Sequence, residues 1–437
     1  MTFILNTFSF LVMGILVMWM AAGFGMLEAG LVRSKNVATI CLKNISLFGI
    51  AGILFYLCGY NLMYAGVDGG YIGSFGLWAA DDAAALAGDY SAGYSASSDW
   101  FFQMVFCGAA CSIVSGCVAE RIKLWSFLLF CAILCGIIYP IQGSWGWGGG
   151  WLSQTWSSMN LGAGYVDFAG SGVVHSVGGV AAFAGAKVLG ARIGKFDKDG
   201  NPRAMPGHHI PMAMLGTLIL LFGWFGFNAA STFAATDVQF ATVATNTAIA
   251  GAFGAIAAMF WITKRSGKPD PGMMANGMLA GLVAVTAPCA FIAPWAAAVI
   301  GVIAAVLVIE SVFFVERKLK LDDPVGAISV HGVGGLFGTL CVGIFSNGSY
   351  GAGWNLSDSD GVKGIIKGDW GQLGAQALGV AVIIVVIGGI AYTFFKLQDI
   401  ISKKMGKGGI RSSEEDELVG LDIPEMGVYA YPEFVKS

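Results

Sequence analysis

The sequence has few charged residues for its length. Only 12% of its 437 residues are Asp, Glu, Lys or Arg, whereas about 25% is usual for a soluble domain. A soluble fold of this size needs a polar surface that these residues cannot supply, so the composition excludes a cytosolic enzyme and a disordered chain. The formal net charge of −3 also argues against a nucleic-acid-binding protein, which needs basic patches.

The cysteines lack the pattern of a disulfide framework. All nine fall inside apolar segments, where they are expected to be reduced, buried and similar to small hydrophobic residues. They are Cys41, Cys58, Cys107, Cys111, Cys117, Cys131, Cys135, Cys289 and Cys341.

Long apolar runs dominate the sequence instead. Hydrophobic residues make up 56% of the chain, its mean hydropathy is +0.72, and 65 residues are glycine, which allows membrane helices to pack closely. A spanning helix needs roughly 20 apolar residues, and the eighth candidate run is short and rich in glycine. The eleven candidate runs are about 5–30, 45–66, 100–119, 124–145, 170–191, 210–232, 240–263, 273–290, 294–316, 326–346 and 372–396.

The basic residues predict how these runs cross the membrane. If the loops are numbered in order, the odd loops and the C-terminal tail, together with Lys187 near the inner end of the fifth run, carry 22 of the 24 Lys and Arg residues, and the even loops carry only Lys363 and Lys367. Basic loops stay cytoplasmic, so the N-terminus is predicted outside and the C-terminus inside. We therefore expect an all-α membrane protein with an eleven-helix domain at 1–396 and a cytoplasmic tail at 397–437.

Two of the runs repeat one motif around a histidine. The string DFAGSGVVHSVGG begins at Asp167 and DPVGAISVHGVGG begins at Asp323, and His175 and His331 each follow their Asp by eight residues. In the predicted topology the two strings enter the membrane from opposite faces. Such a pattern is typical of inverted repeats with a functional site at their interface.

The repeat divides the spans into two five-helix halves in inverted topology, about 5–191 and 210–346, with the eleventh helix outside it. Ionisable groups at mid-membrane usually line a path or cavity. One alternative is that both histidines are neutral packing residues. A metal site is disfavoured because no Cys, Asp or Glu stands at ligand spacing from either histidine.

Two buried imidazoles restrict what a narrow lumen could conduct. Burial disfavours imidazolium, and a neutral ring donates with one nitrogen and accepts with the other. Such a lumen offers no fixed charge to an ordinary cation, but it admits a guest that sheds its charge. Ammonium does so by becoming ammonia, whereas potassium cannot. The same lining would also suit a channel for water or another small solute.

Aromatic residues gather at the predicted outer ends of three spans. Phe102 and Phe106 lie one turn apart on one helix face, Trp147 ends the fourth span, and Phe227 precedes Ser231 at the end of the sixth. An aromatic cluster with a hydroxyl acceptor is typical of a cation site. The alternative is the interfacial aromatic belt of membrane proteins.

These features together resemble the ammonium transporter (Amt/Mep/Rh) family, on its Amt branch, from about residue 8 to 432. The resemblance implies a multi-pass protein of the plasma or inner membrane, embedded in lipid, that assembles as a homotrimer with one pore in each protomer. It implies no enzyme activity, no cofactor and no nucleic acid. The motifs that carry it are GFGMLEAGLVRSKN at 23–36, Ala119-Glu120-Arg121, DFAGSGVVH at 167–175, GWFGFNAAS at 223–231, Val285-Thr286-Ala287-Pro288 and VHGVGG at 330–335.

The resemblance also implies roles for single residues. It places an outer ammonium site at Phe106, Trp147 and Ser231, and it makes Phe106 and Phe227 a stacked gate. It makes His175 and His331 the pair that lines the pore. Four further residues would support the pore: Asp167, Trp224, Thr286 and Phe102.

The sequence departs from the family pattern at two places. Ala230 stands where the family often has glycine, and Met426-Gly427-Val428 replaces the central triplet of the tail motif between Leu421 and Tyr431. Docking of a PII-type signalling protein at the cytoplasmic face is therefore less supported than the pore. Asp167 has an alternative explanation too, since Asp commonly caps a helix N-terminus.

The implied function is ammonium uptake for nitrogen supply, with methylammonium as an analogue and with neutral or electrogenic transport left open. The alternative is an ammonium sensor that signals through the tail at 397–437. Its acidic run at 414–417 favours a solvated tail, and the tail is too short for a signalling domain. The sequence also lacks the nucleophile–base pair that an intramembrane enzyme would need.

Overall fold

The apolar runs fold into helices because a bilayer leaves the backbone no water with which to bond. In the computed structural model, which describes residues 1–434, ten helical segments are long and apolar enough to cross a membrane. This confirms the prediction of an all-α membrane protein. The segments contain α1 (Thr2–Leu31), α2 (Val37–Leu54) with α3 (Tyr60–Tyr64), α5 (Ala96–Cys117), α6 (Leu124–Ile133) with α7 (Tyr139–Gly146), the turn Ser171–Ser176 with α9 (Val177–Leu189), α10 (Ile210–Ala229), α11 (Gln239–Ser266), α13 (Pro294–Arg317), the turn Ile328–Val333 with α14 (Gly334–Phe345), and α15 (Trp370–Val382) with α16 (Gly388–Lys404).

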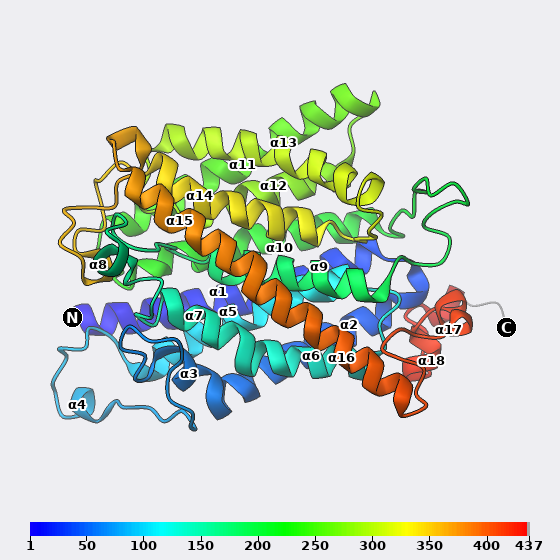
Figure 1. The fold of residues 1–437 in the computed structure, drawn as a ribbon, viewed down its shortest axis with the longest axis horizontal. Helices are drawn as coiled ribbons and strands as arrows, with labels where there is room; N and C mark the ends of the chain where they lie inside the picture. Colours follow the sequence, from blue (N-terminus) through cyan, green and yellow to red (C-terminus); the bar gives the residue numbers. More distant parts are fainter. Residues whose placement is uncertain (435–437) are drawn as a thin grey trace.

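A further helix, α12 (Pro271–Thr286), occupies the place of the eighth predicted run but has only 16 residues. The carboxylate of Asp270 caps it by accepting from the amide of Met273 at 2.9 Å. It packs against both α11 and α13. The two termini lie at opposite ends of the bundle (Figure 1), as an odd number of crossings requires. The count of eleven spans and their orientation remain predictions.

The end of the bundle that holds the N-terminus also carries the short helices α4 (Ala83–Leu86) and α8 (Thr155–Met159) (Figure 1). The other end holds the C-terminal segment with α17 (Glu414–Val419) and α18 (Asp422–Met426). The last long helix continues to Lys404, beyond the predicted domain boundary at 396. The nine cysteines are all free, and eight of them are buried.

The tail is docked on the bundle, which corrects the expectation that its acidic run is solvated. Glu414 and Glu415 are exposed, but Glu417 is only 1% exposed. Its carboxylate pairs with Arg411 at 2.7 Å and accepts from the amide of Ile193 at 2.6 Å. A long-range partner on another loop therefore buries one member of a run that local sequence alone assigns to solvent.

A second carboxylate fastens the tail to α2. Asp422 is buried and accepts from the amides of Ala38 and Thr39 at 3.1 and 2.8 Å, and from the Thr39 hydroxyl at 2.9 Å. These amides belong to the first turn of α2 and have no partner within the helix. The tail thus supplies the cap of a helix far from it in the sequence.

Candidate functional site

Both motif histidines lie on π-helical turns at the start of a longer helix. His175 is in the turn Ser171–Ser176, which α9 continues, and His331 is in the turn Ile328–Val333, which α14 continues. Such π-turns are frequent at functional sites, although three others, Phe55–Gly59, Leu134–Ile138 and Ile383–Ile387, lie elsewhere in this bundle. The matching local conformation supports the repeat that the sequence predicts.

An aspartate caps each of these turns. The two carboxylate oxygens of Asp167 accept from the amides of residues 170–173 at 2.8 to 3.0 Å. Asp323, eight residues before the second histidine, accepts from the amide of Ile328 at 2.7 Å. The capping explanation for Asp167 therefore matches its geometry, because four amides occupy its oxygens.

The glycines that follow each histidine let the two motifs approach closely. A methyl group on Gly179 would lie 2.8 Å from the carbonyl carbon of His331. A methyl group on Gly335 would lie 2.6 Å from the hydroxyl oxygen of Ser176. Any side chain larger than hydrogen would separate the two turns, so these glycines bring the histidines together.

The two imidazole rings are in direct contact. The Nδ1 atoms of His175 and His331 are 3.2 Å apart, and the rings are stacked with centroids 5.2 Å apart. A hydrogen bond between these atoms needs one ring to donate and the other to accept. Both rings therefore cannot be imidazolium at once, and the Nε2 atom of His175 is buried without a protein partner among the described residues.

Aromatic rings fix the position of His175. The indole of Trp224 stacks on it with centroids 5.0 Å apart, and Phe227 stacks at 5.4 Å. Trp224 is fully buried and donates its indole N–H to the hydroxyl of Thr286 at 2.9 Å. The Thr286 hydroxyl in turn donates to the carbonyl of Leu282 at 2.7 Å. The chain of contacts leaves the imidazole little freedom.

Two phenylalanine rings stack next to the histidines. Phe106 and Phe227 are stacked with centroids 3.9 Å apart, and each side chain is essentially inaccessible to solvent. Phe102 packs on Phe106 with centroids 4.8 Å apart. Because Phe227 also touches His175, the phenylalanine pair and the imidazole pair form one continuous stack.

A cavity of about 400 Å³ adjoins this stack. Trp147 lies in its wall and donates its indole N–H to the carbonyl of Asp167 at 2.6 Å, and Ser231 donates to the carbonyl of Phe227 at 2.9 Å. The Ser231 oxygen keeps lone pairs for a guest. The lining residues are Tyr60, Tyr64, Tyr94, Asp99, Phe102, Gln103, Phe106, Gly146, Trp147, Tyr165, Asp167, Phe168, Ser231, Phe233, Trp354 and Asn355.

The structure thus brings together every residue that the sequence analysis assigned to the site. Four further residues, to which the sequence pattern assigns no role, line the same cavity: Tyr60, Tyr64, Asp99 and Gln103. A signal for Asp99 was present, because it precedes Phe102 by three residues and Phe106 by seven, and such positions share one helix face.

Very little free space adjoins His331 on its other side. His331 borders a gap of only about 10 Å³ that it shares with Phe24 and the buried carboxylate of Glu28. A space of that size holds about one water molecule. The space beside His331 is therefore too small for a hydrated ion.

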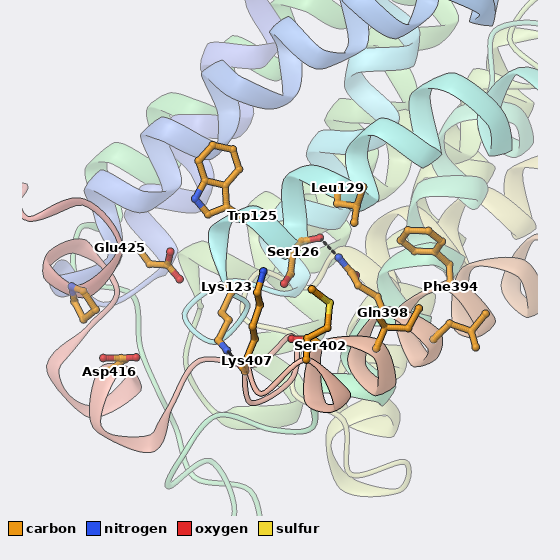
Figure 2. Close-up of a pocket in the computed structure, with 14 residues that line it drawn as sticks. Lys123, Trp125, Ser126, Leu129, Phe394, Gln398, Ser402, Lys407, Asp416 and Glu425 are labelled. Atoms are coloured by element: carbon orange, nitrogen blue, oxygen red, sulfur yellow. Dashed lines mark hydrogen bonds between the residues drawn. The ribbon is translucent and has the colours of Figure 1, made fainter.

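A larger groove of about 780 Å³ lies elsewhere, where α6, α16 and the tail meet (Figure 2). Gln398 of α16 bonds to the carbonyl of Ser126 beside it at 2.9 Å. The groove shares none of its lining residues with the cavity above the phenylalanine pair. Its size reflects an open junction between helix ends and tail, and none of the residues predicted for the site lines it.

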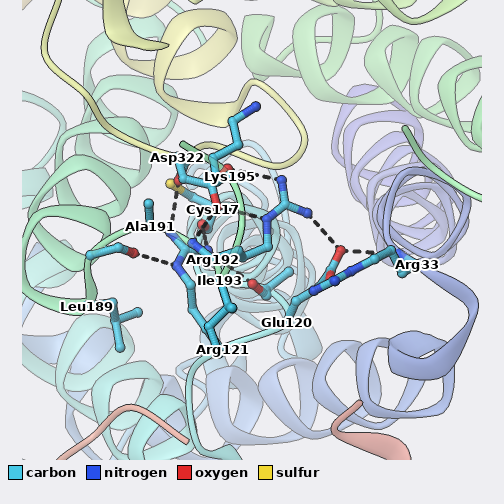
Figure 3. Close-up of polar contacts among 12 residues, drawn as sticks. Arg33, Cys117, Glu120, Arg121, Leu189, Ala191, Arg192, Ile193, Lys195 and Asp322 are labelled. Carbon is cyan, nitrogen blue, oxygen red and sulfur yellow. Dashed lines mark hydrogen bonds and ion pairs between the residues drawn. The ribbon is translucent and has the colours of Figure 1, made fainter. Parts of the chain in front are cut away.

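A buried ion cluster joins the loops at the tail end of the bundle (Figure 3). Glu120 pairs with Arg33 and, at 2.8 Å, with Arg192. Arg192 also binds both oxygens of Asp322, at 2.8 and 3.0 Å. Burial alone would raise the pKa of Asp322, but the guanidinium groups of Arg121 and Arg192 hold it well below its usual range.

These features define a class of protein. An all-α membrane protein whose buried cavity narrows through stacked rings to a pair of contacting imidazoles is built as a channel or transporter. The comparisons with known proteins specify the family.

The chain matches the Ammonium Transporter Family over residues 8–431. It is 45% identical over 427 residues to the ammonium transporter Amt2 of Archaeoglobus fulgidus, covering 97% of this chain and 88% of that protein. It also superposes on a structure named Sensor Amt Protein, with a TM-score of 0.85, 36% identity and coverage of 97% and 99%. Mep2 of Candida albicans superposes with a TM-score of 0.82, 26% identity and coverage of 98% and 92%. The chain belongs to the ammonium transporter family and is a multi-pass protein of the plasma membrane.

Proposed function

We propose that the protein transports ammonium across the membrane by letting it pass the histidine pair as ammonia. The observation that carries this proposal is the 3.2 Å contact between the Nδ1 atoms of His175 and His331, directly beside the stacked Phe106 and Phe227. Similarity to the Amt2 ammonium transporter over nearly the whole chain supports the choice of substrate.

Recruitment takes place in the 400 Å³ cavity. The faces of Phe106 and Trp147 attract a cation through their ring quadrupoles, and the Ser231 oxygen accepts one of its N–H groups. Because the phenylalanine pair leaves no open path in this conformation, the guest has to displace a ring and lose water before it enters.

Discrimination takes place at the histidines. An ammonium ion that transfers one proton to water in the outer cavity becomes ammonia, a neutral molecule with three N–H donors and one lone pair, which matches neutral imidazoles. A potassium ion has no proton to give and keeps its charge. Removing its water in this narrow space therefore costs far more free energy than removing water from a neutral solute. Because the two cations are of similar size, size cannot exclude potassium. The passage excludes it because the lining carries no fixed charge that would stabilise a desolvated cation.

The same proposal includes the topology and assembly: eleven spans, N-terminus outside, C-terminus inside, and a homotrimer embedded in lipid. The positive-inside pattern of the loops supports the orientation. The docked tail lies at the end predicted to be cytoplasmic, where a PII-type protein would have to bind.

Flux measurements test the proposal. The full chain in proteoliposomes is expected to take up methylammonium, and His175→Ala and His331→Ala are each expected to change the uptake rate, the exclusion of potassium, or both. Current recorded in the same preparation separates electrogenic from neutral transport. Unchanged uptake and unchanged potassium exclusion in both variants would reject the role of the histidines.

A sensor is the second candidate, favoured by the superposition on the structure named Sensor Amt Protein and by the tail contacts with α2. A sensor would bind ammonium tightly without conducting it. Saturable binding in the absence of flux would therefore favour sensing over transport.

A further inference from the structure

A buried carboxylate lies in the wall of the cavity above the phenylalanine pair. Asp99 is in the first turn of α5, is 8% exposed, and lines the same cavity as Phe106, Trp147 and Ser231. We propose that Asp99 is a cation-binding residue of this cavity, which draws small monovalent cations such as ammonium and methylammonium into it. The inference rests on the proposed function, because it names a further substrate-binding residue of the same site.

The contacts of Asp99 leave its charge uncompensated. Its Oδ2 atom accepts from the hydroxyl of Tyr60 at 2.6 Å, and its Oδ1 atom accepts from the side-chain amide of Gln103 at 3.2 Å. The hydroxyl of Tyr64 donates to the Gln103 oxygen at 2.8 Å and so orients that amide. Both donors to Asp99 are neutral, and no Lys or Arg among residues 1–434 forms an ion pair with it.

A buried carboxylate without a cationic partner is costly. A mobile cation in the cavity would supply the missing charge, and each carboxylate oxygen keeps lone pairs for its N–H groups. Aromatic side chains surround the carboxylate, since Tyr60 and Tyr64 pack with centroids 5.1 Å apart and Tyr94 lines the same cavity. Carboxylate and ring faces together form a site suited to a small cation.

The position of Asp99 suits it to attract cations but not to select between them. It stands on the cavity side of the phenylalanine pair, whereas the histidines lie behind that pair. A carboxylate attracts potassium as well as ammonium, so Asp99 is expected to set how tightly the cavity holds either cation. Selection between the two stays with the histidines.

A structural role for Asp99 predicts a different outcome. An acidic residue in the first turn stabilises a helix through the helix dipole. Loss of that effect would lower the thermal stability of the protein, but it would leave the concentration of methylammonium at half-maximal uptake unchanged.

The test compares variants of the full chain in proteoliposomes with methylammonium as the probe. Asp99→Asn, which keeps the shape of the side chain, is expected to raise the apparent KM about tenfold, equivalent to about 1.4 kcal/mol of binding. The maximal rate is expected to stay within about twofold, because the gate and histidines are intact. Potassium, as a competitor of uptake, is expected to lose potency by a similar factor.

Asp89→Asn is the matched control. Asp89 is an exposed carboxylate in the same outer segment, and its side chain accepts from the amide of Ser91 at 2.9 Å. Its removal changes the net charge by the same amount outside the cavity. We expect no change of KM in this variant, and an equal rise in both variants would overturn the proposal.

An unchanged KM in Asp99→Asn, or a fall in maximal rate alone, would also overturn it. If that variant does not fold, Asp99→Glu keeps the charge and moves it by one methylene, and it is expected to change the KM two- to fivefold. Thermal stabilisation of the detergent-solubilised protein by methylammonium separates the two proposals. Stabilisation that Asp99→Asn weakens, without uptake by the native protein, would reject transport but keep the role of Asp99.

Discussion

Arg192 and Asp322 form a deeply enclosed ion pair: two hydrogen bonds of 2.8 and 3.0 Å join a guanidinium and a carboxylate whose side chains are 3% and 1% exposed. Glu120 binds the same guanidinium at 2.8 Å, and Arg121 donates to the backbone carbonyl of Asp322 at 2.8 Å. One cluster therefore ties the loops after α5, α9 and α13 together at the tail end of the bundle (Figure 3).

Breaking this pair should destabilise the protein strongly. Asp322→Asn leaves Arg192 buried with one of its two carboxylate partners missing, and such a change typically costs about 3–5 kcal/mol. We expect a clear fall in the thermal midpoint of the purified protein in detergent. Glu310→Gln is the control, because Glu310 pairs with Arg265 at an exposed site and should cost about 1 kcal/mol or less. Equal effects of the two variants would contradict the burial argument.

The same pair predicts how stability depends on pH. The folded pKa of Asp322 lies below its ordinary value of about 3.9, so its contribution is fully present above about pH 5 and is lost as the pH falls through the folded pKa. The gap in thermal midpoint between the native protein and Asp322→Asn should be constant from about pH 5 to 8. It should shrink in stronger acid, and a gap that widens there would contradict the assigned sign.

The helices and the members of the pore site were accessible from sequence because hydropathy and motif spacing are local signals. Hydropathy gives no signal for Asp99, because the apolar run begins at residue 100 and leaves Asp99 in the predicted loop, although α5 starts at Ala96. The burial of Glu417 depends on Arg411 and on the backbone of Ile193. The contact with Ile193 lies far away along the chain, and no local charge pattern reveals it.

The contact between Trp224 and Thr286 predicts a positioning role for the threonine. Thr286→Val keeps the volume but leaves the buried indole N–H without its acceptor, so the ring that stacks on His175 loses its anchor. We expect a several-fold fall in the maximal rate of methylammonium uptake with little change in KM, because the outer cavity is untouched. Thr286→Ser keeps the hydroxyl and should restore the rate. If valine and serine behave alike, the hydroxyl is not the cause.

A single methyl group added to the last glycine of a histidine motif is expected to reduce uptake strongly. In Gly179→Ala the added carbon would lie 2.8 Å from the backbone of His331, which is well inside normal contact distance. The two turns would have to separate, which would lengthen the 3.2 Å contact between the imidazoles. We expect methylammonium uptake to fall at least tenfold, together with a lower thermal midpoint. Gly389→Ala, on α16 with no atom within 4 Å of the added methyl, is the control and should leave both unchanged. Native uptake in Gly179→Ala would show that the histidine contact is not required for conduction, whereas loss of uptake in Gly389→Ala would mean that the helices tolerate no added volume anywhere.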